Sequence, residues 1–498
     1  MMDLFLQGTA TLFSSWTSIG IFFAGLIGGL LFGAIPGISM LTLAAIFLPF
    51  SGYLSAADAI MFYSVLYCSG TYGGAVTAIL FNIPGAPENA PTAFDGYPMT
   101  QQGKAGKAIG AAVICSALGG TCSVIFMMLA TPLLADIAVV HFGPPEIFAL
   151  VFFGIAVASS VGAKTLWKGW LSVLLGLLLA TVGLDPVAGE ERYTFDLYYL
   201  MAGLHFVPVI LGFFAVSEVL VQAERRASGS FDMPKFATTF PTLAEFISLR
   251  WAVARSVVLG FFAGILPGIG ATLAAFLSYN EAVRWSKTPE KFGKGELEGV
   301  VASETANNAA TGAAMIPLLA LGLPGGALTA MMVGVFQMHD IEPGPLVFIN
   351  SSDLVWVVFA AMFFANICIL VLGFVETKTV LHLLRIPFQV LAPGILLMST
   401  IGAYATRNQV IDVAVMFAAG ILAYFMRRTG YSVPGIVLGL ILGKIGEQTF
   451  AQGMQMVSYD VGDFVTRPIV AVLLLAGILT VLTSVYRALK GSRKELDI

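Results

Sequence analysis

Apolar runs long enough to span a membrane recur along nearly the whole chain, separated by short polar stretches. No charged residue lies between Asp3 and Asp58. A membrane-spanning helix needs ~20 mostly apolar residues, so the pattern predicts an all-α polytopic membrane protein with roughly 10–12 spans. The runs outside the segment 251–350 fall near residues 18–50, 59–83, 107–131, 145–163, 166–184, 200–222, 352–375, 390–404, 409–426, 431–446 and 467–486.

Proline and glycine interrupt some of these runs at membrane depth. The clearest case is the segment 72–98, which begins as an apolar run and then carries four prolines between residues 84 and 98. No continuous helix can cross such a segment, because proline removes a backbone donor and clashes with the preceding turn. Non-helical backbone at this depth is tolerated only where it is buried in protein or lines a wet cavity. We therefore expect a binding site near the polar residues of the segment, which are Asn82, Glu88, Asn89 and Asp95.

The breaks occur twice, in the same order. Pro36-Gly-Ile recurs as Pro267-Gly-Ile, 231 positions later, and Pro84-Gly recurs as Pro324-Gly, 240 positions later. A single Pro-Gly is most simply a kink, because both residues are common in transmembrane helices. Paired breaks at matched spacing instead favour an internal repeat and mark the binding site of a secondary transporter. We predict two repeat-related halves of inverted topology, with broken helices or re-entrant hairpins.

This repeat divides the chain into four parts. We expect a first transmembrane half at 1–221, a polar connector at 222–250, a second repeat at 251–390 and C-terminal scaffold helices at 391–498. The basic pair Arg427-Arg428 and the basic tail fit cytoplasmic ends, whereas the acidic stretch 447–463 fits the opposite side. The C-terminus is thus predicted to be cytoplasmic, and the side of the N-terminus stays open.

The second half carries an unusual polar group at the head of an apolar run. Glu304, Asn307 and Asn308 share one face if the segment is helical. An ionisable residue inside a membrane bundle is costly and by default marks an ion or substrate path. The alternative is a helix cap at the water interface, because Lys294 and Glu298 lie just upstream.

The breaks suit the binding of a small carboxylate. A helix that restarts after Pro-Gly offers unpaired backbone donors and a positive dipole end, and Arg and Lys are scarce inside the predicted spans. Glu304 and Asp95 are the candidates to carry a proton, or to coordinate Na⁺ together with carbonyls of unwound backbone. The candidate substrate-binding residues are Ser39, Tyr72, Gly73, Gly74, Asn82, Pro84, Gly85, Glu88, Asn89, Gly268, Gly270, Thr272, Asn307, Asn308, Pro324 and Gly325.

Composition argues against other functions. Only 11% of residues are charged, against about 25% in soluble domains, and no basic tract points to nucleic acid. The four cysteines and four histidines show no metal-ligand spacing, and there is no phosphate-binding Gly-x-x-x-x-Gly-Lys-Ser/Thr motif. We expect no enzyme activity, no resident metal and no cofactor other than a coupling ion, H⁺ or Na⁺.

Several motifs together resemble one known family, the large membrane subunit of the tripartite tricarboxylate transporters. The resemblance implies a secondary transporter of the bacterial inner membrane that takes up organic acids with an H⁺ or Na⁺ gradient. It also implies two partners besides the lipid bilayer: a small four-helix membrane subunit and a periplasmic solute-binding protein. The motifs are Tyr72-Gly-Gly, Asn82-Ile-Pro-Gly85, Thr92-Ala-Phe-Asp-Gly-Tyr-Pro98, Gly103-Lys-Ala-Gly106, Glu304-Thr-Ala-Asn-Asn308, Ile316-Pro-Leu-Leu319, Gly322-Leu-Pro-Gly325, Pro343-Gly-Pro-Leu346, Pro36-Gly-Ile-Ser39 and Pro267-Gly-Ile-Gly270.

The chain departs from this pattern at Glu88 and Asn89, where citrate-type relatives are expected to have small residues and Ser or Thr. A carboxylate beside an anion site disfavours a trianion by like-charge repulsion. Glu88 either faces water or reads a hydroxyl or amine of the substrate, so both tricarboxylates and dicarboxylates stay open. Two other functions also stay open: an H⁺- or Na⁺-coupled carboxylate symporter without a binding protein, and a membrane scaffold or channel.

Overall fold

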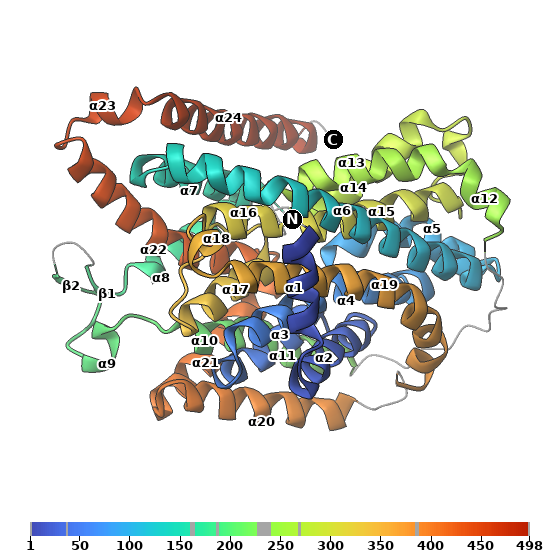
Figure 1. Ribbon diagram of the computed structural model, residues 1–498, viewed down its shortest axis with the longest axis horizontal. Coiled ribbons are helices and arrows are strands. Elements are labelled where there is room, and N and C mark those ends of the chain that lie inside the picture. Colours follow the sequence, from blue (N-terminus) through green and yellow to red (C-terminus); the bar gives the residue numbers. More distant parts are fainter. Residues whose placement is uncertain are drawn as a thin grey trace.

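The computed structural model describes residues 2–35, 38–159, 165–185, 189–226, 241–266, 270–383 and 388–496 (Figure 1). Most of these residues are helical, and the described strands are only β1 (Gly183–Leu184) and its antiparallel partner β2 (Glu191–Arg192). The predicted all-α membrane architecture is confirmed. Six described helices are long and apolar enough to span a membrane, and five more apolar helices are shorter. The predicted total of roughly 10–12 spans is reached only if the shorter helices also cross the membrane.

The first half contains α1 (Met2–Leu12), α2 (Trp16–Gly33), α3 (Met40–Phe47), η1 (Leu48–Tyr53), α4 (Ala56–Phe81), η2 (Pro87–Asn89), α5 (Ala90–Gln101) and α6 (Ala105–His141). The second half contains α13 (Arg250–Gly264), α14 (Gly270–Trp285), η4 (Pro289–Lys291), α15 (Leu297–Ala313), α16 (Met315–Leu321), α17 (Ala327–Met338), α18 (Val347–Asn350) and α19 (Ser352–Leu383). In both halves the break is followed by a helix of 12 residues, α5 or α17, and then by a long helix, α6 or α19.

The two Pro-Gly breaks that the structure describes have the same local geometry. The C-cap residues Asn82 of α4 and Gly322 of α16 are both in the left-handed conformation, with φ of 57° and 73°. The following N–H reaches back into its helix in each case, from Ile83 to the carbonyl of Thr77 (3.3 Å) and from Leu323 to the carbonyl of Pro317 (3.0 Å). All three positions are 240 residues apart, so the internal repeat extends to individual hydrogen bonds.

The halves run in opposite directions. The end of α5 meets the start of the α15 segment, where Gln102 Nε2 donates to the carbonyl of Lys294 at 2.7 Å. The end of α17 meets the segment that leads into α4, where His339 Nε2 lies 3.1 Å from the carbonyl of Ser51. Each broken segment thus ends beside the start of the broken segment of the other half, as expected for an inverted repeat.

The long helix after each break packs on the opposite half. α6 lies along α15, where a Cβ on Gly119 would come within 2.3 Å of the carbonyl oxygen of Thr305. α19 lies along α4, where Tyr72 donates to the carbonyl of Gly373 at 3.3 Å. Figure 1 shows α4, α15, α17 and α19 in the middle of the molecule, so the repeats form one interlocked core.

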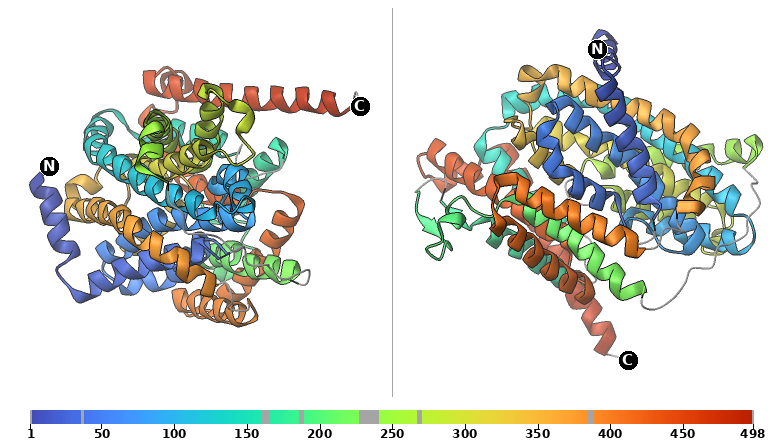
Figure 2. Two further views of the ribbon diagram at one scale, coloured as in Figure 1. Left: turned by 90° about the vertical axis from the view of Figure 1, so that its right-hand side faces the viewer. Right: turned by 90° about the horizontal axis from the view of Figure 1, so that it is seen from below.

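Further helices surround this core. Within them, α22 packs on α7 and α8, and α24 packs on α7. Figure 2 shows the C-terminal end of α24 projecting beyond the other helices. These elements are α7 (Pro144–Ala158), α8 (Leu166–Ala180), α9 (Tyr198–Met201), α10 (Phe206–Ile210), the π-helical η3 (Leu211–Val216), α11 (Ser217–Arg226), α12 (Leu243–Ser248), α20 (Phe388–Arg407), α21 (Val410–Thr429), α22 (Val433–Met456), α23 (Val461–Val465) and α24 (Pro468–Leu496).

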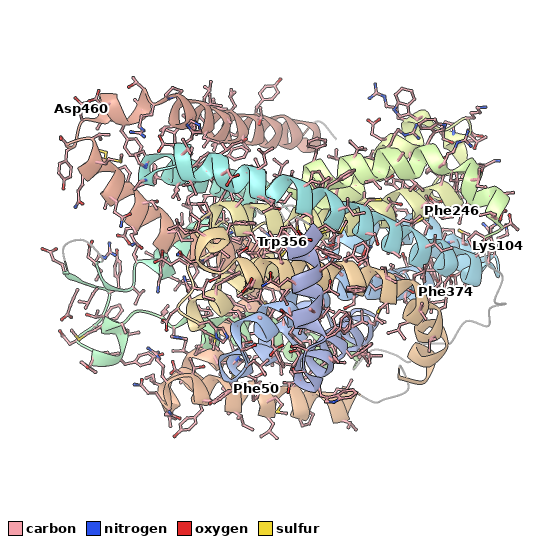
Figure 3. The ribbon with its side chains drawn as sticks, viewed as in Figure 1. Phe50, Lys104, Phe246, Trp356, Phe374 and Asp460 are labelled. Carbon is pink, nitrogen blue, oxygen red and sulfur yellow. The ribbon has the colours of Figure 1, made fainter. Side chains whose placement is uncertain are left out.

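The predicted connector is described only in part. Residues 222–226 end α11, residues 227–240 lie outside the described residues, and α12 follows with Thr242 as its N-cap. An ion pair between Lys107 and Glu245 ties α12 to the start of α6. Figure 3 shows Lys104 and Phe246 together at this end of the molecule and Asp460 at the opposite end.

Candidate functional site

The segments that flank all four Pro-Gly breaks converge on one cavity of about 80 Å³. A buried water needs about 10–15 Å³ of such space, so the cavity admits several waters. Residues 36–37 and 267–269, including the predicted site residue Gly268, lie outside the described residues. The lining residues are Met40, Leu41, Tyr67, Ala86, Pro87, Glu88, Gly270, Ala271, Thr272, Gly325, Gly326, Ala327, Leu328 and Pro434.

Four described helices begin at this cavity: α3 at Met40, α14 at Gly270, α17 at Ala327 and α22 at Val433, next to the lining residue Pro434. The first N–H groups of a helix have no partner within it, and the helix dipole places partial positive charge there. Arg, Lys and His are absent from the described residues that line the cavity. Backbone donors rather than basic side chains therefore make this cavity attractive to an anion.

Glycine is required where the first break packs against its own half. A Cβ on Gly85 would lie 2.4 Å from the carbonyl oxygen of Gly33 and 2.5 Å from Cα of Gly74. A Cβ on Gly73 would likewise lie 2.6 Å from the carbonyl oxygen of Leu30. These predicted site glycines therefore hold α2, α4 and the break in close contact, and they are not among the cavity-lining residues.

A second polar group lies where the halves meet, centred on the fully buried side chain of Glu304 in α15. Its Oε1 accepts hydrogen bonds from Thr92 of α5 at 2.5 Å, from Asn307 at 3.2 Å and from Asn89 at 3.5 Å. Its Oε2 accepts one from Ser116 of α6 at 3.1 Å. Glu304 lies well inside α15, so the alternative role as a helix cap does not apply.

The asparagines connect this group to the cavity wall. Asn307 Nδ2 also donates to the carbonyl of Glu88 at 3.3 Å, and Asn89 Nδ2 donates to the carbonyl of Thr71 at 2.9 Å. Asn308 Nδ2 donates to Ser116 Oγ at 2.8 Å. The segment that carries Glu88 into the cavity is thus attached to the same helix face as Glu304.

Asp95 occupies a different place from Glu304. Its Oδ1 accepts from the backbone N–H groups of Gly295 at 2.9 Å and Glu296 at 2.8 Å, and its Oδ2 accepts from Tyr279 Oη at 2.8 Å. A carboxylate in this position satisfies free donors at the start of α15 and complements the helix dipole. A residue of the first half therefore caps a helix of the second.

The predicted site residues fall into three groups. Glu88, Gly270, Thr272 and Gly325 line the cavity, and Asn89, Asn307, Asn308 and Glu304 form the buried polar group. The remaining described candidates lie at packing or helix-end positions rather than on the cavity wall. These are Ser39, Tyr72, Gly73, Gly74, Asn82, Pro84, Gly85, Pro324 and Asp95.

Some residues of the cavity and of the buried polar group around Glu304 were not predicted from the sequence. Pro434 belongs to Pro434-Gly-Ile, the same triplet as at residues 36 and 267, so this signal was present in the sequence. Tyr67 lies in an apolar run without a motif, and Ser116 lies among small residues of α6. A single hydroxyl in such surroundings carries no signal until the fold places it beside a carboxylate or a cavity.

Comparison with known proteins gives one family and two relatives. The model of the tripartite tricarboxylate transporter TctA family matches residues 19–438. An uncharacterised 52.8 kDa protein in the TAR-I ttuC' 3' region of Agrobacterium vitis is 34% identical over 500 residues, covering 100% of this chain and 99% of that protein. An uncharacterised protein in the TAR-II ttuC' 3' region of the same organism is 35% identical over 239 residues, 48% of this chain and 99% of that protein. No solved structure matches.

Proposed function

Because the chain belongs to the tripartite tricarboxylate transporter TctA family, we propose that it forms the membrane pathway of a secondary transporter that imports a small organic carboxylate. The supporting observation is the cavity between the two repeats, at which four described helices begin and which no described basic side chain lines. Such helix ends bind the carboxylate of the substrate in transporters with broken helices. Transport, not catalysis, is the activity that this arrangement supports.

The transporter has two partners in this proposal. A periplasmic solute-binding protein delivers the substrate, and a small four-helix membrane subunit completes the complex in the bacterial inner membrane. Family membership supports this assignment. Exposed apolar side chains on α24, such as Leu475, Leu479 and Leu482, also supply a surface for lipid or another membrane helix.

Glu304 is the proposed coupling residue. Its carboxylate is buried, and every hydrogen bond that it receives in the described structure comes from a neutral hydroxyl or amide. A buried charge is costly unless a counter-charge accompanies it. Binding of H⁺ or Na⁺ would supply that charge, and the bond from Asn307 to the carbonyl of Glu88 would transmit the change to the cavity wall.

Uptake into membrane vesicles tests the proposal. Radiolabelled dicarboxylates and tricarboxylates are offered to vesicles that contain this chain, with and without the two partner proteins from the same source, under an imposed H⁺ or Na⁺ gradient. We expect accumulation only with the partners and one gradient, and none after the gradient is collapsed. Accumulation by this chain alone would indicate a self-sufficient symporter, and passive equilibration would indicate a channel.

A further inference from the structure

Glu88 is the only charged residue that lines the cavity in the described part of the chain. Glu88 is 7% exposed, and no hydrogen bond from another described residue reaches its carboxylate, although the backbone N–H of Glu88 itself lies beside it. A buried, unpartnered carboxylate is expensive, because it loses its hydration without compensation. Something other than the fold must therefore account for its presence.

The internal repeat shows that the fold does not need a carboxylate here. Ala86, Pro87 and Glu88 occupy the positions equivalent to Gly326, Ala327 and Leu328, which line the cavity from the second half. The same place in the same local structure is therefore filled by leucine in one half and by glutamate in the other. Because leucine serves the packing equally well, Glu88 points to a ligand.

The two halves thus give the cavity two chemically different sides. The second half contributes the starts of α14 and α17, whose free N–H groups attract a carboxylate. The first half contributes the start of α3 as well, and it adds the carboxylate of Glu88 and, beside it, Tyr67, which is 6% exposed. A ligand with only carboxylate groups would meet like charge at Glu88.

We propose that Glu88 accepts a hydrogen bond from a donor on the substrate, so that the transported molecule is a carboxylate that also carries a hydroxyl or ammonium group. The inference rests on the proposed carboxylate transport and adds a substrate subclass and the residue that selects it. The donor would satisfy the unpartnered carboxylate while the substrate carboxylate binds at the helix starts. A substrate without the donor would leave the carboxylate of Glu88 buried and unpaired. A polar site discriminates most strongly against a ligand that leaves one of its buried groups in this state.

Ligand binding to the purified full-length chain in lipid nanodiscs tests this directly, without the selectivity of a binding protein. The ligands are matched in skeleton: tricarballylate against citrate, and succinate against malate and aspartate. We expect the donor-bearing acid to bind about ten- to hundred-fold more tightly, the effect of one hydrogen bond to a charged group. A preference for malate identifies a hydroxy acid, and a preference for aspartate identifies an amino acid.

Two variants assign the preference to Glu88. Glu88→Leu, which copies Leu328, should bind donor-bearing and plain acids equally, and Glu88→Gln should keep a reduced preference for the hydroxy acid. Glu342→Gln removes an exposed carboxylate outside the cavity and should behave as the unmodified chain. Size-exclusion elution shows whether each variant is folded.

The outcomes separate the two proposals. Equal binding of plain and donor-bearing acids by the unmodified chain, or a preference that survives in both Glu88 variants, would overturn the role of Glu88 and leave carboxylate transport intact. A pH-dependent affinity without donor preference would also overturn it, because Glu88 would then serve as a proton carrier. Binding of no carboxylate by folded protein would overturn the proposed function and this inference together.

Discussion

Thr92 Oγ1 donates a 2.5 Å hydrogen bond to Oε1 of Glu304, which lies 212 positions further along the chain. Thr92 is on α5, which follows the break at Pro84-Gly85. Glu304 is on α15, which precedes the break at Pro324-Gly325. The bond therefore joins the two repeat-related halves directly. A change of charge at Glu304 acts on both halves at once.

Glu304→Gln should abolish gradient-driven accumulation while the protein still folds. Glutamine keeps the size and one acceptor oxygen, but it cannot take up a proton or offer a full negative charge to Na⁺. Vesicle uptake under the coupling gradient should fall to the level seen without a gradient, and counterflow exchange of substrate should persist. Glu290→Gln, at an exposed position of η4, is the matched control and should accumulate normally. Normal accumulation by Glu304→Gln would remove Glu304 from coupling.

Gly85→Ala should destabilise the first break and slow transport. The new Cβ would lie 2.4 Å from the carbonyl oxygen of Gly33, and such overpacking costs about 1–3 kcal/mol. Gly394→Ala is a control with the same Pro-Gly dipeptide, because nothing lies within 4 Å of a Cβ there. Thermal unfolding in detergent and uptake rates should change for Gly85→Ala only. Equal behaviour of the two variants would show that the tight packing at Gly85 is relieved without cost.

The breaks and their pairing could be predicted from sequence because proline and glycine act locally on the backbone. The triplet Pro-Gly-Ile does not determine the local structure by itself. Pro393-Gly-Ile lies inside the continuous helix α20, whereas Pro434-Gly-Ile begins α22 at the cavity. Whether the preceding residues are already helical decides between the two cases. That is a property of the surroundings rather than of the triplet.

Side-chain roles within the predicted site were harder to derive. Asp95 and Glu304 look alike in sequence, as carboxylates near a break in each half. Asp95 accepts two backbone N–H bonds at the start of α15, whereas Glu304 accepts only side-chain donors and is fully buried. The difference depends on packing between the halves, which lie about 200 residues apart and which no local pattern encodes.

Asp95→Ala should lower stability through loss of the cap on α15. Removal of an N-cap acceptor costs about 0.5–2 kcal/mol, and Tyr279 would lose its partner as well. Thermal unfolding should show the decrease, and Asp136→Ala, at an exposed position of α6, should show little change. Tyr279→Phe should cost about 1 kcal/mol, the value of one hydrogen bond. An Asp95 variant with unchanged stability but no coupled uptake would instead support an ion-carrying role.

The contact between α12 and α6 should weaken at acidic pH, because it contains the ion pair between Lys107 and Glu245. The ammonium of Lys107 lowers the pKa of Glu245 from 4.5 to about 2, with help from the backbone N–H of Thr242. Because this pKa is depressed, the contact is fully formed above pH 4.5 and is lost as the pH falls towards 2. Glu245→Gln should raise hydrogen exchange of residues 243–248 relative to the unmodified chain at pH 7, and the difference should disappear near pH 2. Equal exchange in the variant and the unmodified chain at pH 7 would show that α12 is held by its apolar contacts, such as Phe246, rather than by the ion pair.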